Sequence, residues 1–133
     1  MAVDLEQELK RTTALRGFRF GLHDFVAKLK GADELKKHND ATEASYLKKG
    51  SLDRKTKELA IIVACVALKD SAAHLHCHMH AATNAGATPE EILELIELVG
   101  GWTGSVAKIN GLEAWRVAFR PDLPTIERVV ELQ

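Results

Sequence analysis

Apolar positions recur at helical spacing along most of the chain, in segments separated by glycines. The pattern predicts helices over about 5–15, within 22–30 and 33–48, from 54 to about 68, from 72 to about 85, from 89 to about 99 and from 103 to 119, with a short one after Pro124. All three prolines lie in the last third of the chain, so residues 1–88 contain no obligatory helix breaker. We therefore expect an all-α domain with no sheet.

Two short stretches carry the signals of helix starts. Asp53 stands where its carboxylate can cap a helix that runs to about Leu68. At 88–91 the sequence Thr-Pro-Glu-Glu combines a capping hydroxyl, a proline at the first helical position and a glutamate three residues after the cap. The second signal predicts a helix that begins at Pro89.

Residues 60–68 are apolar around the whole circumference of the predicted helix. A buried strand would show a similar run, but the periodic segment begins near Arg54 and is too long for a strand. A helix on the surface of a lone monomer should carry a polar stripe there, and Ala81, Ala82 and Ala85 form a row of small residues suited to close helix packing. We expect a homo-oligomer; the alternative is a compact monomer that buries this segment at its centre.

Composition narrows the class of protein. The chain has 133 residues, of which 46% are hydrophobic and 28% charged, as in one soluble globular domain over 1–133. A net charge of −1 and 5% aromatic residues argue against a nucleic-acid partner. No apolar run approaches the roughly 18 residues of a membrane span, and the N-terminus lacks the pattern of a signal peptide. With two cysteines and no disulfide scaffold, a cytoplasmic location is expected.

Four of the six histidines lie between residues 74 and 80. On a helix, His74 and His78 share one face with Cys77 nearby, whereas His76 and His80 point largely the other way. Three interpretations stay open: acid–base chemistry, for which imidazole is suited; a zinc site, which lacks a third ligand and the glutamate of an H-E-x-x-H motif; and histidines that only satisfy hydrogen bonds.

Glu58 is in line with the apolar positions Ile61, Ile62 and Cys65 of its helix. It is either a buried acid or a first-turn residue that favours the helix dipole and reaches solvent. A buried carboxylate needs a partner, and a histidine of the next antiparallel helix would serve. Glu58 and His78 are thus the candidate dyad.

Glu97 and Trp102 are two further candidates for the site. Glu97 follows Leu93 by four positions, so we expect it to face inward, while Glu94 is expected to face water. Trp102 could wall a pocket or belong to the core.

Two blocks resemble a known family: DRKTKELAII at 53–62 and HMHAATNAGATPEEILE at 78–94. They are similar to the carboxymuconolactone decarboxylase family, whose superfamily includes alkyl hydroperoxidase D. The resemblance covers about 51–119, with 1–50 as additional N-terminal helices. It implies an all-helical fold of the alkyl hydroperoxidase D-like type, assembled as trimers or hexamers, with the site between packed helices at subunit contacts.

The peroxidase branch of that superfamily carries a glutamate, then C-x-x-C, then a histidine four residues after the second cysteine. Counted back from His78, the cysteine positions hold Ser71 and His74, while Glu58 takes the glutamate position within about one residue. Without two thiols at i and i+3, no disulfide can form within the motif, so dithiol cycling is not expected. A single-thiol peroxidase based on Cys77 stays open as an alternative.

The decarboxylase branch needs no cysteine pair. The resemblance implies proton transfer on a small acidic lactone from aromatic breakdown, with neither a metal nor an organic cofactor. The roles we expect are His78 as proton donor, Glu58 as its orienting partner, and His74 as binder of the substrate carboxylate or second acid. Besides the peroxidase, the alternative is an oligomeric binding protein without catalysis.

Overall fold

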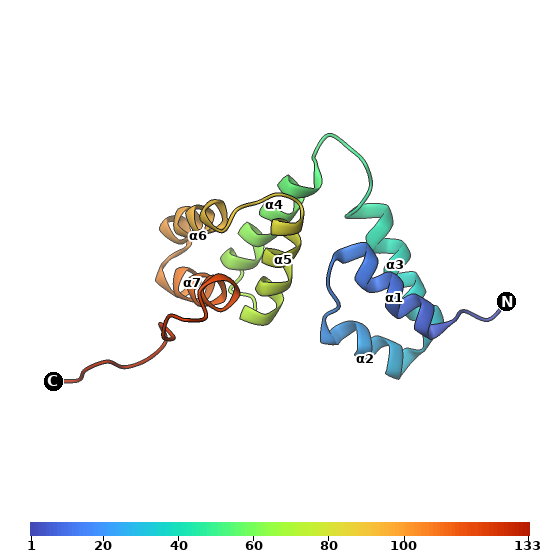
Figure 1. The fold of residues 1–133 in the computed structure, drawn as a ribbon, viewed down its shortest axis with the longest axis horizontal. Helices are drawn as coiled ribbons and strands as arrows, with labels where there is room; N and C mark the ends of the chain where they lie inside the picture. The colour runs from blue at the N-terminus through green and yellow to red at the C-terminus, as the bar shows by residue number, and fades with distance from the viewer. The chain divides into compact units, whose positions relative to one another are not determined.

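The chain folds into seven α-helices without a strand in a computed structural model that describes all of residues 1–133 (Figure 1). The helices are α1 (Leu5–Arg16), α2 (Gly21–Lys30), α3 (Ala32–Ser45), α4 (Arg54–Ala67), α5 (Ala72–Asn84), α6 (Pro89–Thr103) and α7 (Ser105–Phe119). The predicted all-α class is confirmed, and so are the seven long helices to within a few residues at their ends.

The helices divide into two compact units, Met1–Lys57 and Glu58–Gln133. The first contains α1, α2, α3 and the first turn of α4, and the second contains the rest of α4 with α5, α6 and α7. The sequence predicted a single domain with a family core from residue 51, and that assignment stays a prediction.

Buried polar contacts hold α1 against α3 in the first unit. Arg16 donates to Asn39 Oδ1 at 2.8 Å, and Asn39 Nδ2 donates to Glu8 Oε2 at 2.8 Å. All three side chains are buried. The buried apolar side chains of this unit are only Ala27 and Leu35. Because buried polar groups must find partners, this network determines how the first unit packs.

An apolar core fills the second unit. Its buried members come from four helices and the loop before α6: Ile62, Cys65, Val66, Leu75, Met79, Ala82, Ala87, Ile92, Ile96, Val99, Ala107 and Ala114. Helix α7 approaches α4 and α6 closely at Gly111, where an added Cβ would lie 2.9 Å from Ile96 Cγ2 and 3.3 Å from Val66. Glycine is needed there because a side chain would push these helices apart.

The predicted helix starts are confirmed in detail. Asp53 Oδ1 accepts the backbone N–H of Thr56 at 2.7 Å at the start of α4. Thr88 Oγ1 accepts the N–H of Glu91 at 3.1 Å, and the Glu91 carboxylate accepts the N–H of Thr88 at 2.9 Å. Helix α6 passes through the two glycines expected to stop it near Val99 and ends instead at Gly104, whose φ of 98° suits glycine.

The short helix predicted after Pro124 is wrong, because no helix follows Phe119. Glu113 accepts hydrogen bonds from the Thr125 hydroxyl and the Ile126 N–H, which tie that part of the segment to α7 in a non-helical conformation. The remaining residues pack against nothing that would stabilise so short a helix, and Val129 and Val130 are exposed.

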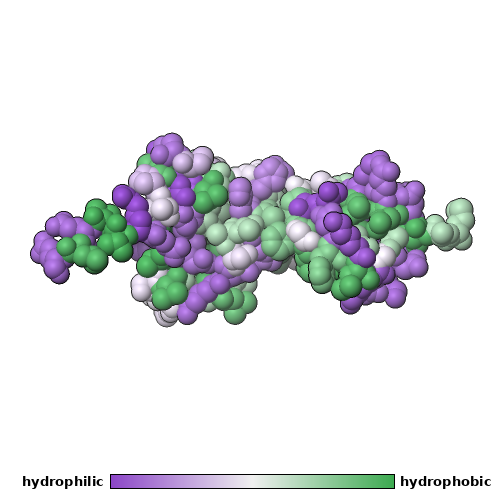
Figure 2. Space-filling model, turned by 90° about the horizontal axis from the view of Figure 1, so that it is seen from below, coloured by the Kyte–Doolittle hydropathy of each residue, from purple (hydrophilic) through white to green (hydrophobic).

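Apolar side chains reach the surface of both units and of the C-terminal segment (Figure 2). On α6 and α7 the most exposed are Leu98, Trp102 and Val106, with 59%, 88% and 63% of their surface accessible. None of the seven helices has the length and apolar character required to span a membrane.

Candidate active site

A buried carboxylate and a buried imidazole meet between α4 and α5. Glu58, in the second turn of α4, is fully buried, and its Oε2 lies 2.9 Å from Nδ1 of His78 on α5. His78 is itself only 8% exposed. The structure thus brings together the two residues of the predicted dyad, and Glu58 is the buried acid rather than a residue reaching solvent.

His74 extends this pair toward the surface. Its Nε2 lies 3.2 Å from Nε2 of His78, one helical turn further along α5, and its Nδ1 contacts Oδ2 of Asp70. The four groups form a continuous string that runs from the Glu58 carboxylate through both imidazoles to the Asp70 carboxylate. We refer to these four residues as the proton string.

Exposure rises along the string from the Glu58 end. The side chain of Glu58 is 0% exposed, that of His78 10%, and those of His74 and Asp70 34% and 32%. His74 and Asp70 are therefore the members of the proton string that solvent reaches, while Glu58 stays shielded from water.

Asp70 is a residue that sequence analysis missed. Its Oδ1 accepts the Ser71 N–H at 2.7 Å, and Asn110 Nδ2 on α7 donates to its backbone carbonyl at 2.5 Å. Burial acts to raise the pKa of Asp70, but hydrogen bonds from His74 and Ser71 outweigh it and hold the pKa below its ordinary value. Asp70 precedes α5, so helical periodicity could not place it; its spacing of four from His74 was the available signal.

One comparison assigns the chain to a protein family. Residues 33–117 match the family model described as the carboxymuconolactone decarboxylase family. The chain belongs to this family. The matched region begins within α3 and includes all four residues of the proton string. No curated protein and no solved structure matches the chain.

In this member of the carboxymuconolactone decarboxylase family, Ser71 and His74 stand at the two positions for which the resemblance to the peroxidase branch implies cysteines. Ser71 caps α5 by accepting the His74 N–H at 3.2 Å, so its place in the structure is that of a helix cap. His74 belongs to the proton string.

Both thiols lie where the thiolate is disfavoured. Burial, followed by the neighbouring Asp70 carboxylate, raises the pKa of Cys65 to about 11. Burial also raises the pKa of Cys77, which is half-buried on α5. Because the thiolate is the nucleophile in peroxide reduction, neither cysteine has the environment of a reactive thiol.

The remaining predicted residues lie on the surface of the chain. Glu97 is exposed, so the expectation that it faces inward is wrong: the buried side of α6 runs through Ile92, Ile96 and Val99, and Glu97 points away from it. Trp102, 88% exposed, projects into solvent and does not belong to the core of the chain. Glu94 is exposed as expected.

Proposed function

We propose that this protein is a decarboxylase-like enzyme that acts on a small lactone or related carboxylate of aromatic catabolism by acid–base chemistry. The observation that carries the proposal is the chain of contacts from buried Glu58 through His78 to half-exposed His74. Such a string stores a proton on imidazole and presents it at the surface of the unit.

The proposed reaction uses that proton once in each turnover. The bond between the lactone carbon and the carboxylate breaks, carbon dioxide leaves, and the electron pair of that bond spreads into the unsaturated lactone as an extended enolate. The imidazolium stabilises this negative charge and then transfers its proton to carbon, which yields the decarboxylated lactone. Water returns a proton to the histidine pair.

Each residue of the string has a distinct role in this proposal. His74, the more exposed imidazole, contacts the substrate as carboxylate binder and second acid. His78 is the proton donor: its Nε2 lies 3.2 Å from Nε2 of His74, so its proton passes to that ring as the Nδ1–H of His74 passes to the substrate carbon. Glu58 is a positioning residue: it accepts the Nδ1–H of His78, selects the tautomer and stabilises the imidazolium.

We also propose that the enzyme is a cytoplasmic homo-oligomer, a trimer or hexamer. Ala60 and Ala64 on α4 and Leu68 directly after it are exposed, as are the apolar side chains at the turn between α6 and α7. Contiguous exposed apolar surface is typical of protein–protein contacts. Both cysteines are free thiols, as suits a reducing compartment.

Loss of carboxymuconolactone, followed by its ultraviolet absorbance, tests the proposed activity. Turnover by the wild-type protein but not by a His78→Ala variant would support it. Binding of the lactone without turnover would contradict it and favour a binding protein, and peroxide reduction that is sensitive to thiol alkylation would contradict it in favour of the peroxidase.

A further inference from the structure

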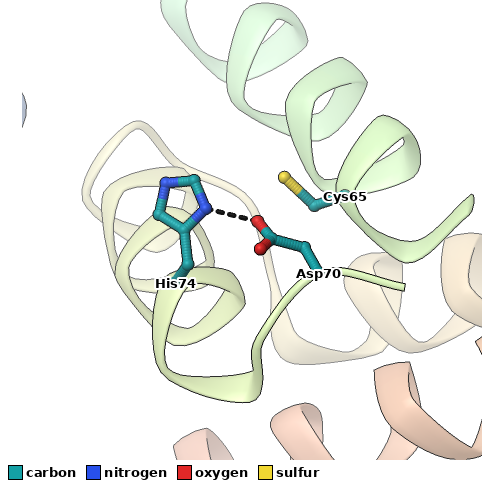
Figure 3. A group of neighbouring side chains, drawn as sticks. All are labelled: Cys65, Asp70 and His74. Carbon is teal, nitrogen blue, oxygen red and sulfur yellow. Dashed lines mark hydrogen bonds and ion pairs between the residues drawn. The ribbon is translucent and has the colours of Figure 1, made fainter. Parts of the chain in front are cut away.

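Three potential metal ligands from different parts of the second unit converge beside the proton string. They are Sγ of Cys65 on α4, a carboxylate oxygen of Asp70 in the following loop, and a ring nitrogen of His74 on α5, all within 4.8 Å of one another. In Figure 3 the Cys65 sulfur and the His74 ring lie on either side of the Asp70 carboxylate. Cys65 is buried and the other two are half-buried.

The chemistry of these donors selects a class of metal. Thiolate and imidazole favour zinc and similar transition metals, whereas magnesium and calcium require oxygen ligands. Three protein ligands leave one of the four tetrahedral positions open to solvent. We propose that Cys65, Asp70 and the Nδ1 atom of His74 form a binding site for a zinc-class divalent cation.

Little movement is needed to close the site around an ion. Zinc–ligand bonds of about 2.0–2.3 Å place tetrahedral ligand atoms roughly 3–4 Å apart. The largest separation among the three atoms is at most 4.8 Å, so changes of about an ångström in the side chains suffice. A thiolate and a carboxylate also balance the two positive charges of the ion, which suits a site that is partly shielded from water.

Neighbouring groups already hold the loop ligand in position. The Ser71 N–H binds one Asp70 oxygen and the Asn110 side chain binds the Asp70 carbonyl, the kind of outer contacts that orient metal ligands. The sequence analysis considered His74 and His78 together as zinc ligands. The site proposed here uses His74 but not His78, because His78 contacts Nε2 of His74 and the ion would bind Nδ1. It also goes beyond the proposed function, which takes no step through a metal.

Cobalt(II) titration of the full-length, reduced, metal-free protein tests the site. A thiolate ligand gives a charge-transfer absorption in the near ultraviolet, and tetrahedral geometry gives visible bands. We expect both to saturate at one equivalent in the wild type and to be displaced by zinc. Cys65→Ser should abolish the charge-transfer band, and Asp70→Asn should weaken binding roughly 10-fold or more.

Two matched controls decide where the ion binds. His76 and His80 form an exposed pair at i and i+4 that could bind cations by itself. The double variant His76→Ala/His80→Ala should keep the full spectrum, and so should Cys77→Ser. Absence of the charge-transfer band in the wild type, or its persistence in Cys65→Ser, would overturn the proposal, as would its loss in the double variant. These readouts are independent of lactone turnover, so failure of the site and failure of the proposed function are distinguishable.

Discussion

The Nε2 atoms of His74 and His78 face each other at 3.2 Å, and each ring has a carboxylate at its Nδ1 atom. A proton held between the two rings therefore has a carboxylate on either side, one buried and one near the surface. In the proposed reaction, this arrangement lets His78, which is 8% exposed, exchange its proton through the more exposed His74.

Glu58→Gln tests the buried end of the string. The amide oxygen can still accept the His78 N–H, but it carries no charge to stabilise an imidazolium. We expect kcat on carboxymuconolactone to fall about 10-fold or more with little change in KM, and Glu58→Asp to recover part of it. Glu94→Gln, an exposed glutamate on α6, is the control. A wild-type kcat in Glu58→Gln would show that Glu58 does not position His78 for catalysis.

Cys77→Ser tests whether a thiol takes part. Burial raises the pKa of Cys77, so little thiolate forms near neutral pH. We expect the variant to decarboxylate the lactone within about 2-fold of the wild-type rate, and alkylation of the wild type to leave that rate unchanged. A peroxidase activity that disappears in Cys77→Ser would refute this expectation.

The first unit should lose stability in mild acid. Burial, together with the charge of Arg16 and the neighbouring His38, lowers the pKa of His23 to about 4, from an ordinary value near 6.5. Between these values the unfolded chain binds a proton that the folded chain does not, so stability falls as pH decreases from about 6.5 to 4.

Hydrogen exchange of the α1–α3 amides in the full-length protein measures this effect. We expect protection to decrease over that pH range, and the decrease to be smaller in His23→Gln. Some pH dependence should remain because burial also lowers the pKa of His38. His76→Gln changes an exposed histidine and should behave as the wild type; equal pH dependence in the wild type and His23→Gln would contradict the assignment.

Trp102 tests the proposed oligomer. This side chain is 88% exposed, with Leu98 and Val106 as exposed apolar neighbours. Sedimentation velocity at micromolar concentration should show a trimer or hexamer for the wild type and smaller species for Trp102→Glu. Leu132→Glu changes an equally exposed residue of the C-terminal segment and should leave assembly intact. A wild type that sediments only as a monomer would remove the proposal.

Local signals in the sequence were enough to predict the seven helices and the contact between two residues of the candidate site. Capping at Asp53 and Thr88 acts within a single turn, so it is visible without tertiary structure. Glu58 could be linked to His78 because a carboxylate on an apolar stripe needs a partner, and the structure places the two in contact.

Features that depend on packing between segments could not be predicted in the same way. Asp70 lies in a loop whose path is fixed by Asn110, 40 residues away in the sequence. The outward direction of Glu97 follows from which side of α6 packs into the core. The absence of a helix after Pro124 depends on Glu113, which binds Thr125 and Ile126 from α7.

The most direct measurement is turnover of carboxymuconolactone by the wild type and by His78→Ala, followed in the ultraviolet with protein of verified fold. We predict a measurable wild-type rate that falls by about 10²–10⁴-fold when the imidazole is removed. Equal rates in the two proteins, or no turnover by the wild type, would contradict the assignment of the proton string as the catalytic centre of a decarboxylase.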